Sequence, residues 1–523
     1  MAATGGKQIK SVLIVGGGTA GWLAACHLAK KLNSKDPDGV QVTLVESPNI
    51  PTIGVGEGTV PAIRRSLQYL GISESEFIQA CDVSFKQSIK FQDWLFNPDD
   101  RRHAYHHVFD YPVQNGCDLT PYYLMGLAGD DSYVNTVSVQ GGLCDAGYGP
   151  KTMTHREYEG VVSYAYHLDA AKFAAFLTKH ATEKLGVIHQ LADVETVTLG
   201  DGGMIASIET PQLGTMTADL YVDCTGFRSL LLGDTVGVPF VDKSDILFVD
   251  TALAVQIPYG DEKAVPCHTI ATAKEAGWIW DIGLLNRRGT GYVYSSAHTS
   301  HDAAEQVLRT YARETLGDQA DDLTLRRIPM KVGYRQKFWE KNCVAIGLSQ
   351  GFVEPLEATG LLIFDATARM IAEQFPATLE AMPALADRFN ARVTHTWEKV
   401  IEFIKLHYVL SRRTDSDFWI DNRRPETIPA ALQQNLEIWR HQPPTAYDFS
   451  SRLEVFNLEN YLYVLYGMDF QTNMAPLKAR YSMDQEAAAT MQAIKGHRQQ
   501  LAGQLLPHRE LLMRAQQFGF QKI

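Results

Sequence analysis

The residues with the clearest chemical meaning form a glycine-rich run, GGGTAG, that begins at Gly16. It follows the β-branched run Ser11–Val15 and precedes a helix-like stretch at residues 22–32. Gly16 permits a tight turn, Gly18 lets the backbone approach a pyrophosphate, and Gly21 allows the helix to pack closely on the strand. The helix N-terminus adds N–H groups and the positive end of the helix dipole. The run therefore predicts a dinucleotide site.

A second predicted strand, residues 41–46, ends in an acidic residue that can accept hydrogen bonds from a ribose. The first set of predicted dinucleotide contacts is Gly16, Gly18, Thr19, Ala20, Gly21 and Glu46. This fingerprint is shared by NAD and FAD proteins, so it does not decide between the two cofactors.

Two later strand-to-glycine transitions bear on that choice. Residues 218–229 (ADLYVDCTGFRS) are typical of a buried strand that ends at Thr225-Gly226, and residues 342–348 (NCVAIGL) form a strand that runs into a glycine-containing segment and a helix. Such long excursions between strands of one sheet are typical of large FAD-binding proteins. No second GxGxxG follows a strand, so we do not expect a separate NAD(P)H domain of the Rossmann type.

Composition limits the classes of protein that can position these residues. The chain has 523 residues, enough for about two to four domains, and its 45% hydrophobic and 21% charged residues are typical of globular proteins. A net charge of -12 disfavours nucleic-acid binding. The 7 cysteines are dispersed without a CxxC pair, so neither a disulfide framework nor a metal site is expected. No apolar run reaches the roughly 18 residues that cross a bilayer, and we expect a cytoplasmic protein without a membrane partner.

Several separated segments together resemble a flavin-dependent halogenase of the tryptophan-halogenase family. In family order they are GGGTAGW (16–22), GVGEGTVP (54–61), SFKQSIKF (84–91), SYAYHLDAAKFAAFL (163–177), DCTGFRSLL (223–231), GWIWDI (277–282), GFVEPLEATG (351–360) and FIKLHYVLSRR (403–413). Many flavoproteins share GxGxxG, whereas the WxW and EPLExTG motifs are much more specific to this family.

The resemblance implies an α/β fold with two parts. We expect a large FAD-binding domain of the glutathione-reductase/aromatic-hydroxylase type, built from residues 1–100 and 155–390 around a GxGxxG Rossmann-like βαβ unit. Residues 101–154 and 391–523 would form a mainly helical substrate module. The segment GVGEGTVP would lie over FAD as a strap. The further FAD contacts that the resemblance implies are Gly54, Val55, Gly56, Glu57, Gly226 and Leu348.

The chemistry implied by the resemblance uses FADH2 from a separate flavin reductase, oxygen and a halide, chloride or bromide, to form hypohalous acid. This oxidant travels through a tunnel to a small aromatic substrate such as tryptophan or indole. The family's catalytic lysine falls on Lys86, which can hydrogen-bond hypohalous acid or become a haloamine. The active-site glutamate falls on Glu357, where a carboxylate can polarise the oxidant or stabilise positive charge on the ring. Halide is expected at the backbone N–H groups of Thr359 and Gly360.

The resemblance also implies a wall between substrate and flavin. Trp278 and Trp280 alternate across Ile279 and would face one side of a strand. His106, in the aromatic stretch 105–111, and Pro355 are assigned to the same substrate wall.

Three further patterns complete the expectations. The stripe Trp397, Ile401, Ile404 and Tyr408 is read as helix core without a catalytic role. Ala358 stands where the family usually has serine, which removes a hydroxyl beside Glu357. Gly283 stands where the family usually has proline, and we expect it to loosen the turn after the strand.

Two other functions remain as alternatives. A single-component aromatic hydroxylase would also carry GxGxxG and a second glycine loop, but it would reduce its own FAD with NAD(P)H. A non-catalytic FAD carrier would need Glu46 and the glycines but neither Lys86 nor Glu357. The WxW and EPLExTG motifs favour the halogenase. The substrate stays open between tryptophan, indole and larger aromatics, and a homodimer is compatible with the sequence.

Overall fold

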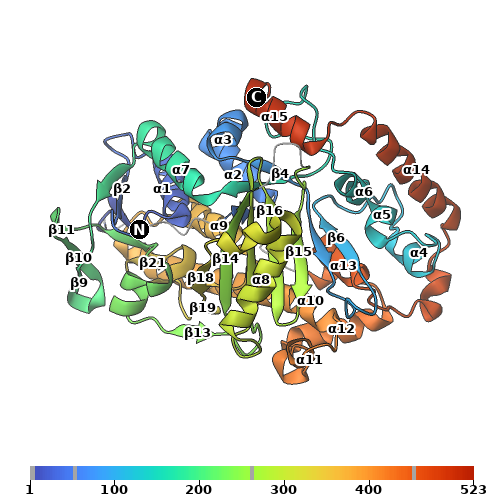
Figure 1. Ribbon diagram of the computed structural model, residues 1–523. Coiled ribbons are helices and arrows are strands. Elements are labelled where there is room, and N and C mark those ends of the chain that lie inside the picture. Colours follow the sequence, from blue (N-terminus) through green and yellow to red (C-terminus); the bar gives the residue numbers. More distant parts are fainter. Residues whose placement is uncertain (1–5, 51–55, 259–263, 450–454, 523) are drawn as a thin grey trace, which may run out of the picture.

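A computed structural model describes residues 6–50, 56–258, 264–449 and 455–522. The chain is arranged around two large sheets (Figure 1). The sheet that contains β1 and β2 lies at one end of the molecule, a larger sheet lies in the middle, and helices α4, α5, α6 and α14 gather at the other end (Figure 1). The α/β fold class predicted from the sequence is confirmed.

The first sheet has the strand order β20-β21-β12-β1-β2-β8. Adjacent strands of this sheet pair in parallel, except β20 and β21, which are antiparallel to each other. Its strands are β1 (Ser11–Val15), β2 (Gln41–Glu46), β8 (Ile188–Leu191), β12 (Leu220–Asp223), β20 (Trp339–Glu340) and β21 (Cys343–Ala345). Val12, Leu13 and Ile14 are all buried, as expected for a parallel strand covered on both faces.

Helix α1 (Thr19–Lys31) follows β1 and packs against α7 (Ala170–Leu185) and α9 (Thr359–Glu373). The predicted strand–turn–helix is therefore confirmed, although the helix begins at Thr19 instead of Trp22. The strand predicted at residues 218–229 ends at Asp223, whose carboxylate accepts hydrogen bonds from N–H groups of the segment that follows, those of Thr225, Leu231 and Leu232.

The central sheet has the order β18-β14-β17-β16-β15-β5-β6. Only the β15–β5 pair is parallel. Its strands are β5 (Ser88–Gln92), β6 (Ala104–Val108), β14 (Thr251–Pro258), β15 (Thr269–Lys274), β16 (Gly277–Gly283), β17 (Arg287–Tyr294) and β18 (Arg326–Pro329). Helix α8 (His301–Leu316) packs against β14 and β17.

Three smaller sheets join these parts. One pairs β3 (Gly56–Gly58), β7 (Ala165–Asp169) and β4 (Ser84–Lys86), in the order β3-β7-β4. Another contains β9 (Thr196–Leu199), β10 (Ile205–Thr210) and β11 (Gly214–Met216), and the last contains β13 (Phe240–Asp242), β19 (Gly333–Arg335) and β22 (Gly351–Phe352). Strand β4 leads through Gln87 directly into β5, so Lys86 lies where the small and central sheets meet.

The remaining helices cover the sheets and form the helical end of the molecule. They are α2 (Ala62–Leu70), α3 (Glu74–Ala80), α4 (Thr120–Leu124), α5 (Tyr133–Val137), α6 (Gln140–Asp145), α10 (Met382–Leu410), α11 (Asp417–Asp421), α12 (Ala430–His441), α13 (Leu458–Gly467), α14 (Asp484–Ala502) and α15 (His508–Phe518). Helix α13 packs on β6, and the C-terminal helix α15 lies beside α3 from the N-terminal half (Figure 1).

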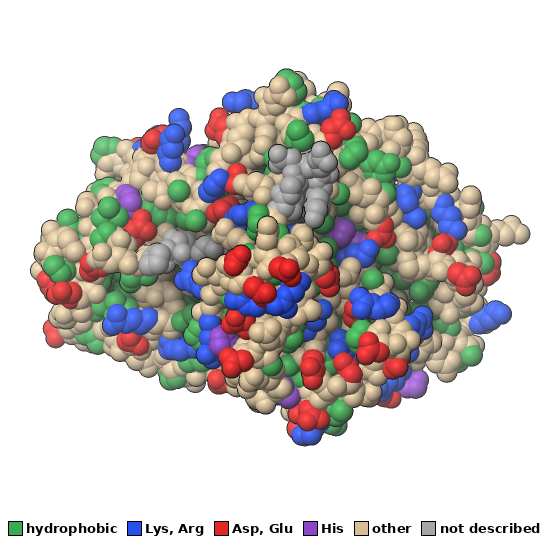
Figure 2. Space-filling model, in the orientation of Figure 1, with side chains coloured by type: hydrophobic (Ala, Val, Ile, Leu, Met, Phe, Trp, Pro, Cys, Tyr) green, Lys and Arg blue, Asp and Glu red, His purple; other side chains and the backbone are tan. Residues whose placement is uncertain are grey.

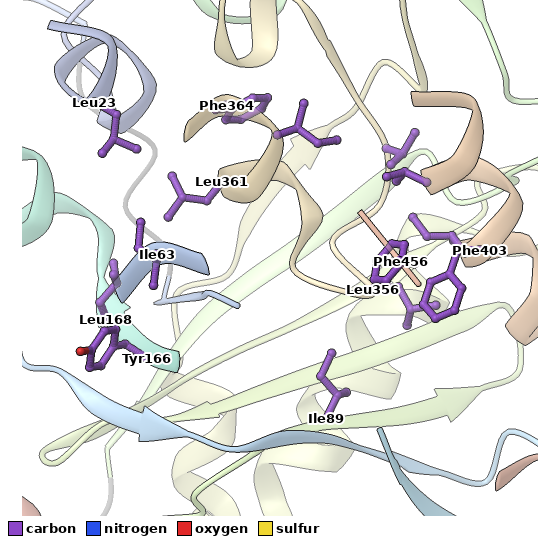
Figure 3. Packing of buried hydrophobic residues seen from close by; sticks show 14 of the residues in the cluster. Leu23, Ile63, Ile89, Tyr166, Leu168, Leu356, Leu361, Phe364, Phe403 and Phe456 are labelled. Atoms are coloured by element: carbon purple, nitrogen blue, oxygen red, sulfur yellow. The ribbon is translucent and has the colours of Figure 1, made fainter. Parts of the chain in front are cut away.

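A continuous apolar core connects the two ends. Figure 3 shows Leu23 and Leu361 in one part of it, and Leu356, Phe403 and Phe456 in another. None of the described helices combines the length and hydropathy that a membrane span requires. Acidic and basic side chains are interspersed over the face drawn in Figure 2.

The proposed division into two domains stays a prediction. Strand β6 pairs with β5, so the predicted boundary at residue 101 falls between two hydrogen-bonded strands of one sheet.

Candidate active site

The glycine turn after β1 has the shape that a pyrophosphate requires. Gly16 has a φ of 111°, and a Cβ there would lie 2.2 Å from the carbonyl oxygen of Cys224. A Cβ on Gly21 would lie 2.0 Å from the carbonyl oxygen of Gly16. At Gly18 a Cβ would meet open space, and no side chain caps the N-terminus of α1. The first-turn N–H groups, including those near Thr19 and Ala20, can therefore bind an anion.

The rest of the predicted dinucleotide site converges on the same edge of the sheet. Glu46 ends β2 and contacts His189 Nε2 at 2.7 Å. Gly226 has a φ of 72° and faces open space. Leu348 lies in the turn Gly347–Ser349, where a Cβ on Gly347 would be 2.7 Å from the Cβ of Ala20. These residues fit FAD, because a glycine cradle, a helix N-terminus and a ribose-binding carboxylate meet at the carboxyl ends of β1 and β2.

The strap is described in part. Gly54 and Val55 lie outside the described residues. Gly56–Gly58 form β3, which pairs with β7, and the Cα of Gly289 lies 3.3 Å from the position of a Cβ on Gly56. Burial raises the pKa of Glu57 to about 7. The strap segment thus packs on the central sheet close to Lys86, since a Cβ on Gly58 would be 3.4 Å from Lys86 Nζ.

Lys86 is buried, with an exposed fraction of 0%, and its Nζ has no hydrogen-bond partner among the described residues. It is the last residue of β4 and is paired with Ala165. The Nζ lies 5.4 Å from the centroid of the Phe109 ring. Burial lowers the pKa of Lys86 to about 7, and the negative charge of Glu357 offsets only part of this effect. An amine without a partner in a buried site is free to bind a reagent.

Glu357 is also buried, and two histidines bind its carboxylate. His107 Nδ1 lies 3.0 and 2.9 Å from its two oxygens, and His407 Nε2 lies 2.9 Å from Oε1. Burial alone would raise the pKa of Glu357, but the contacts with His107 and His407 lower it to about 2. Glu357 is therefore a carboxylate at neutral pH. The side chain of Glu357 does not cap α9.

The EPLE segment carries a second buried carboxylate that the sequence did not single out. Trp278 Nε1 donates to Glu354 Oε2 at 2.7 Å, and Tyr408 Oη donates to the same oxygen at 2.6 Å. Burial raises the pKa of Glu354 to about 7. Trp278 and Trp280 share one face of β16 and are both buried. Glu354 thus fixes the indole of Trp278 and links the WxW motif to α10.

The segment after Glu357 forms a backbone turn suited to an anion. Ala358 has a φ of 54° and its N–H donates to the carbonyl oxygen of Pro355 at 3.0 Å. Thr359 and Gly360 then begin α9, whose N-terminus has no side-chain cap. A left-handed residue followed by helical residues points successive N–H groups to one side. The predicted halide position therefore has suitable backbone geometry.

One sequence expectation, for Gly283, was wrong. Gly283 does not loosen a turn: it is the buried last residue of β16, pairs with Arg288, and accepts a hydrogen bond from Ser84 Oγ at 2.6 Å. The predicted core stripe of Trp397, Ile401, Ile404 and Tyr408 on α10 is buried. The same helix also supplies His407 to Glu357 and Tyr408 to Glu354.

The structure brings His107, and not His106, to Glu357. The two side chains project from opposite faces of β6, as neighbours in a strand must. His106 contacts Ser88 Oγ at 2.9 Å and Asp145 at 3.1 Å. The assignment of His106 and Pro355 to a substrate wall stays a prediction. Period-2 alternation along β6, which places His107 on the opposite face from His106, was the sequence signal that distinguishes the two histidines.

The site combines a buried amine, a buried carboxylate and a nucleotide cradle. Strands β4 and β5 bring Lys86 to the region where Ile89 projects toward Leu356 (Figure 3). No group of three or more His, Cys, Asp or Glu side chains suited to a metal occurs in the described part of the chain. An amine of lowered pKa beside an ionised carboxylate can hold an electrophile and stabilise the positive charge that develops on its target.

Comparison with known proteins places this geometry in a family. The family model described as tryptophan halogenase matches residues 11–482. Among curated proteins, the tryptophan 6-halogenase SttH of Streptomyces toxytricini is 39% identical over 455 residues, covering 83% of this chain and 84% of that protein. The tryptophan 7-halogenase RebH of Lentzea aerocolonigenes is 36% identical, covering 83% of this chain and 82% of that protein.

Solved structures agree with these relatives. The crystal structure of a tryptophan halogenase from Shewanella frigidimarina superposes with a TM-score of 0.94 and 41% identity, and 99% of each chain is covered. Tar14, a tryptophan C-6 flavin-dependent halogenase from taromycin biosynthesis, superposes with a TM-score of 0.89 and 34% identity, covering 97% of this chain and 100% of that one.

Proposed function

Because the chain belongs to the tryptophan halogenase family and is a flavin-dependent halogenase, we propose that Lys86 and Glu357 transfer halogen to an electron-rich aromatic such as tryptophan or indole. The observation that carries this proposal is the buried Lys86 amine, which has no partner among the described residues and lies within electrostatic reach of Glu357.

The role proposed for Lys86 follows from its protonation. A pKa of about 7 leaves a large fraction of Lys86 as the neutral amine at neutral pH. The ammonium form can donate a hydrogen bond to hypohalous acid, and the neutral amine can react with it to give a haloamine and water. Either form fixes the electrophilic halogen near the aromatic ring.

The role proposed for Glu357 is electrostatic. When the halogen bonds to a ring carbon, the ring becomes a cation until the proton on that carbon leaves. A carboxylate held by His107 and His407 is already oriented and ionised, so it stabilises this cation without reorganisation. The ring proton leaves with the displaced amine or hydroxide, which restores the aromatic ring.

We assign FAD to the cradle formed by Gly16, Gly18, Gly21, Glu46 and Gly226, and halide to the N–H groups of Thr359 and Gly360. Bound reduced FAD supplies the electrons that, with oxygen and halide, yield hypohalous acid. A separate flavin reductase supplies that FADH2, since no second nucleotide motif follows a strand in the sequence. The pair Trp278–Glu354 keeps the indole wall in place between flavin and substrate.

A reductase-coupled reaction tests the proposal. The enzyme is incubated with FAD, NADH, a flavin reductase, bromide, and either tryptophan or indole, and products are analysed by mass spectrometry. A gain of one bromine in place of hydrogen is the expected result. A gain of one oxygen would favour the hydroxylase alternative, and an unchanged aromatic with either substrate would contradict the assignment of these substrates.

A further inference from the structure

The two histidines that bind Glu357 do not have the same protonation, because their other ring nitrogens have different partners. His107 Nδ1 and His407 Nε2 face the carboxylate, so the opposite nitrogen of each ring reports on its tautomer. Carbonyl oxygens only accept hydrogen bonds, and backbone N–H groups only donate them, which fixes the direction of each bond.

The chain of hydrogen bonds beyond His107 makes this residue neutral. The backbone N–H of Asn457 donates to Asn460 Oδ1 at 2.8 Å, which orients the Asn460 amide. Asn460 Nδ2 therefore points to His107 Nε2, at 3.0 Å, and donates to it. A ring nitrogen that accepts a hydrogen bond carries no proton. His107 is thus the neutral tautomer with its proton on Nδ1, directed at Glu357.

The bond beyond His407 has the opposite consequence. His407 Nδ1 lies 3.0 Å from the carbonyl oxygen of Phe403, one turn earlier in α10, so Nδ1 must carry a proton. If His407 were neutral, Nε2 would direct a lone pair at Glu357 Oε1 across 2.9 Å. The contact therefore needs one more proton, either on His407 Nε2 or on Glu357.

We propose that this proton resides on His407, which is an imidazolium that keeps Glu357 ionised and acts as a positioning residue for halogen transfer. The inference deepens the proposed function and rests on the role of Glu357 stated above. An imidazole is a stronger base than a carboxylate, with ordinary pKa values of about 6.5 and about 4.3, so in a contact where both groups are equally buried the shared proton resides on the histidine. Neither histidine is exposed: His407 and His107 have exposed fractions of 0% and 2%.

The groups that face this pair from each neighbouring element support the assignment. Strand β5 contributes Phe91, whose ring centroid is 4.9 Å from that of His407, and Trp94 lies 6.1 Å away. Strand β6 contributes neutral His107 and Tyr105, whose pKa is raised well above its ordinary value by burial and by Glu357. Lys86 is the other cationic group that interacts with Glu357. The imidazolium is thus the charge in direct contact with the carboxylate.

The positive charge proposed for His407 also affects the protonation of Lys86. An ion pair with no net charge attracts a proton to Lys86 less strongly than an isolated carboxylate would. The imidazolium of His407 therefore allows the neutral Lys86 amine to form beside an ionised Glu357. Removing that positive charge would either protonate Glu357 or hold Lys86 in its ammonium form.

Histidine-selective 15N labelling of the full-length, FAD-loaded enzyme tests the proposal directly. The His407 signals are identified by comparison with His407→Gln, and His441→Gln on the exposed surface serves as the matched control. We expect both ring nitrogens of His407 to carry protons at neutral pH. In Glu357→Gln the counter-ion is lost, and only one ring nitrogen of His407 should then carry a proton under the same conditions. A single protonated nitrogen on His407 of the unmodified enzyme would overturn the proposal.

The pH dependence of the halogenation rate is a second test. If His407 had only a structural role, its replacement would not shift this pH dependence. In His407→Gln, an amide replaces the imidazolium and the pKa of Glu357 should rise, so activity should fall as pH decreases, by about tenfold per pH unit below that pKa. His441→Gln should retain the profile of the unmodified enzyme. An unshifted profile in folded, FAD-binding His407→Gln would contradict the proposal. Loss of halogenation by the unmodified enzyme would instead count against the proposed function, and the NMR result would still stand.

Discussion

Replacing Lys86 with methionine should stabilise the protein while it abolishes halogen transfer. Lys86 is buried without a hydrogen-bond partner among the described residues, and its pKa is lowered from 10.5 to about 7. At about 1.4 kcal/mol per pH unit, this difference corresponds to about 4 kcal/mol of destabilisation at neutral pH. Methionine has a similar length and no charge, and the surroundings relax, so we expect Lys86→Met to increase the free energy of unfolding by about 1 to 4 kcal/mol.

The sign of the pH dependence is fixed by the direction of the shift. Between the folded pKa of about 7 and the unfolded pKa of 10.5, the unfolded chain binds a proton at Lys86 that the folded chain does not. Stability of the unmodified enzyme therefore rises with pH in this window, and the destabilisation is complete below it. The advantage of Lys86→Met should be largest below about pH 7 and should shrink by about 1.4 kcal/mol per pH unit above it.

Urea unfolding followed by tryptophan fluorescence, at matched FAD concentration and several pH values, measures this advantage. Lys179→Met, on the surface of α7, is a suitable control because the same substitution removes no buried charge there. The reasoning would be refuted if Lys86→Met were no more stable than the unmodified enzyme at any pH. A pH-independent advantage would also refute it, because desolvation of an ammonium would then not be its cause.

Three other predictions concern the carboxylate and the cofactor. Glu357→Gln keeps the shape but removes the charge, so product formation should fall about 10- to 1000-fold with FAD affinity unchanged; an unchanged rate in the coupled assay would exclude an electrostatic role. Gly18→Val meets no protein atom within 4 Å of its Cβ, so it should fold normally but lose FAD affinity in a fluorescence titration; full affinity would contradict the cradle. NADPH alone should not bleach bound FAD at a catalytic rate in stopped flow, and rapid bleaching would favour the hydroxylase.

The strand, turn and helix proposed to hold the nucleotide could be predicted from sequence because their requirements are local. A strand, a glycine turn and a helix are consecutive in the chain, and Gly16 and Gly21 have backbone contacts that exclude a Cβ. The start of the helix differs from the prediction: α1 begins at Thr19 instead of Trp22, because the first turn of a helix needs no apolar periodicity. The pieces of EPLExTG and WxW were found by resemblance, and the structure joins them through Trp278 and Glu354.

The histidine contacts of Glu357 could not be predicted, because they depend on long-range packing. His107 and His407 are separated from Glu357 by 250 and 50 residues, and no local pattern relates them. A histidine on an apolar helix face, such as the one around Ile404, usually belongs to the hydrophobic core. The sequence therefore predicted only a core stripe for this helix. The contact between His407 and Glu357 depends on the packing of α10 beside β5 and β6, which no local pattern in the sequence shows.

The most direct test of the central claim separates oxidant formation from halogen transfer at Lys86. Lys86→Ala and the unmodified enzyme are supplied with reductase, FAD, oxygen and bromide, and oxygen consumption and brominated indole or tryptophan are measured together, beside an FAD titration. We expect Lys86→Ala to bind FAD and to consume oxygen at a rate similar to that of the unmodified enzyme, yet to make no brominated aromatic. Bromination by Lys86→Ala at the unmodified rate would contradict the claim, and loss of product through loss of FAD binding would make Lys86 a structural residue.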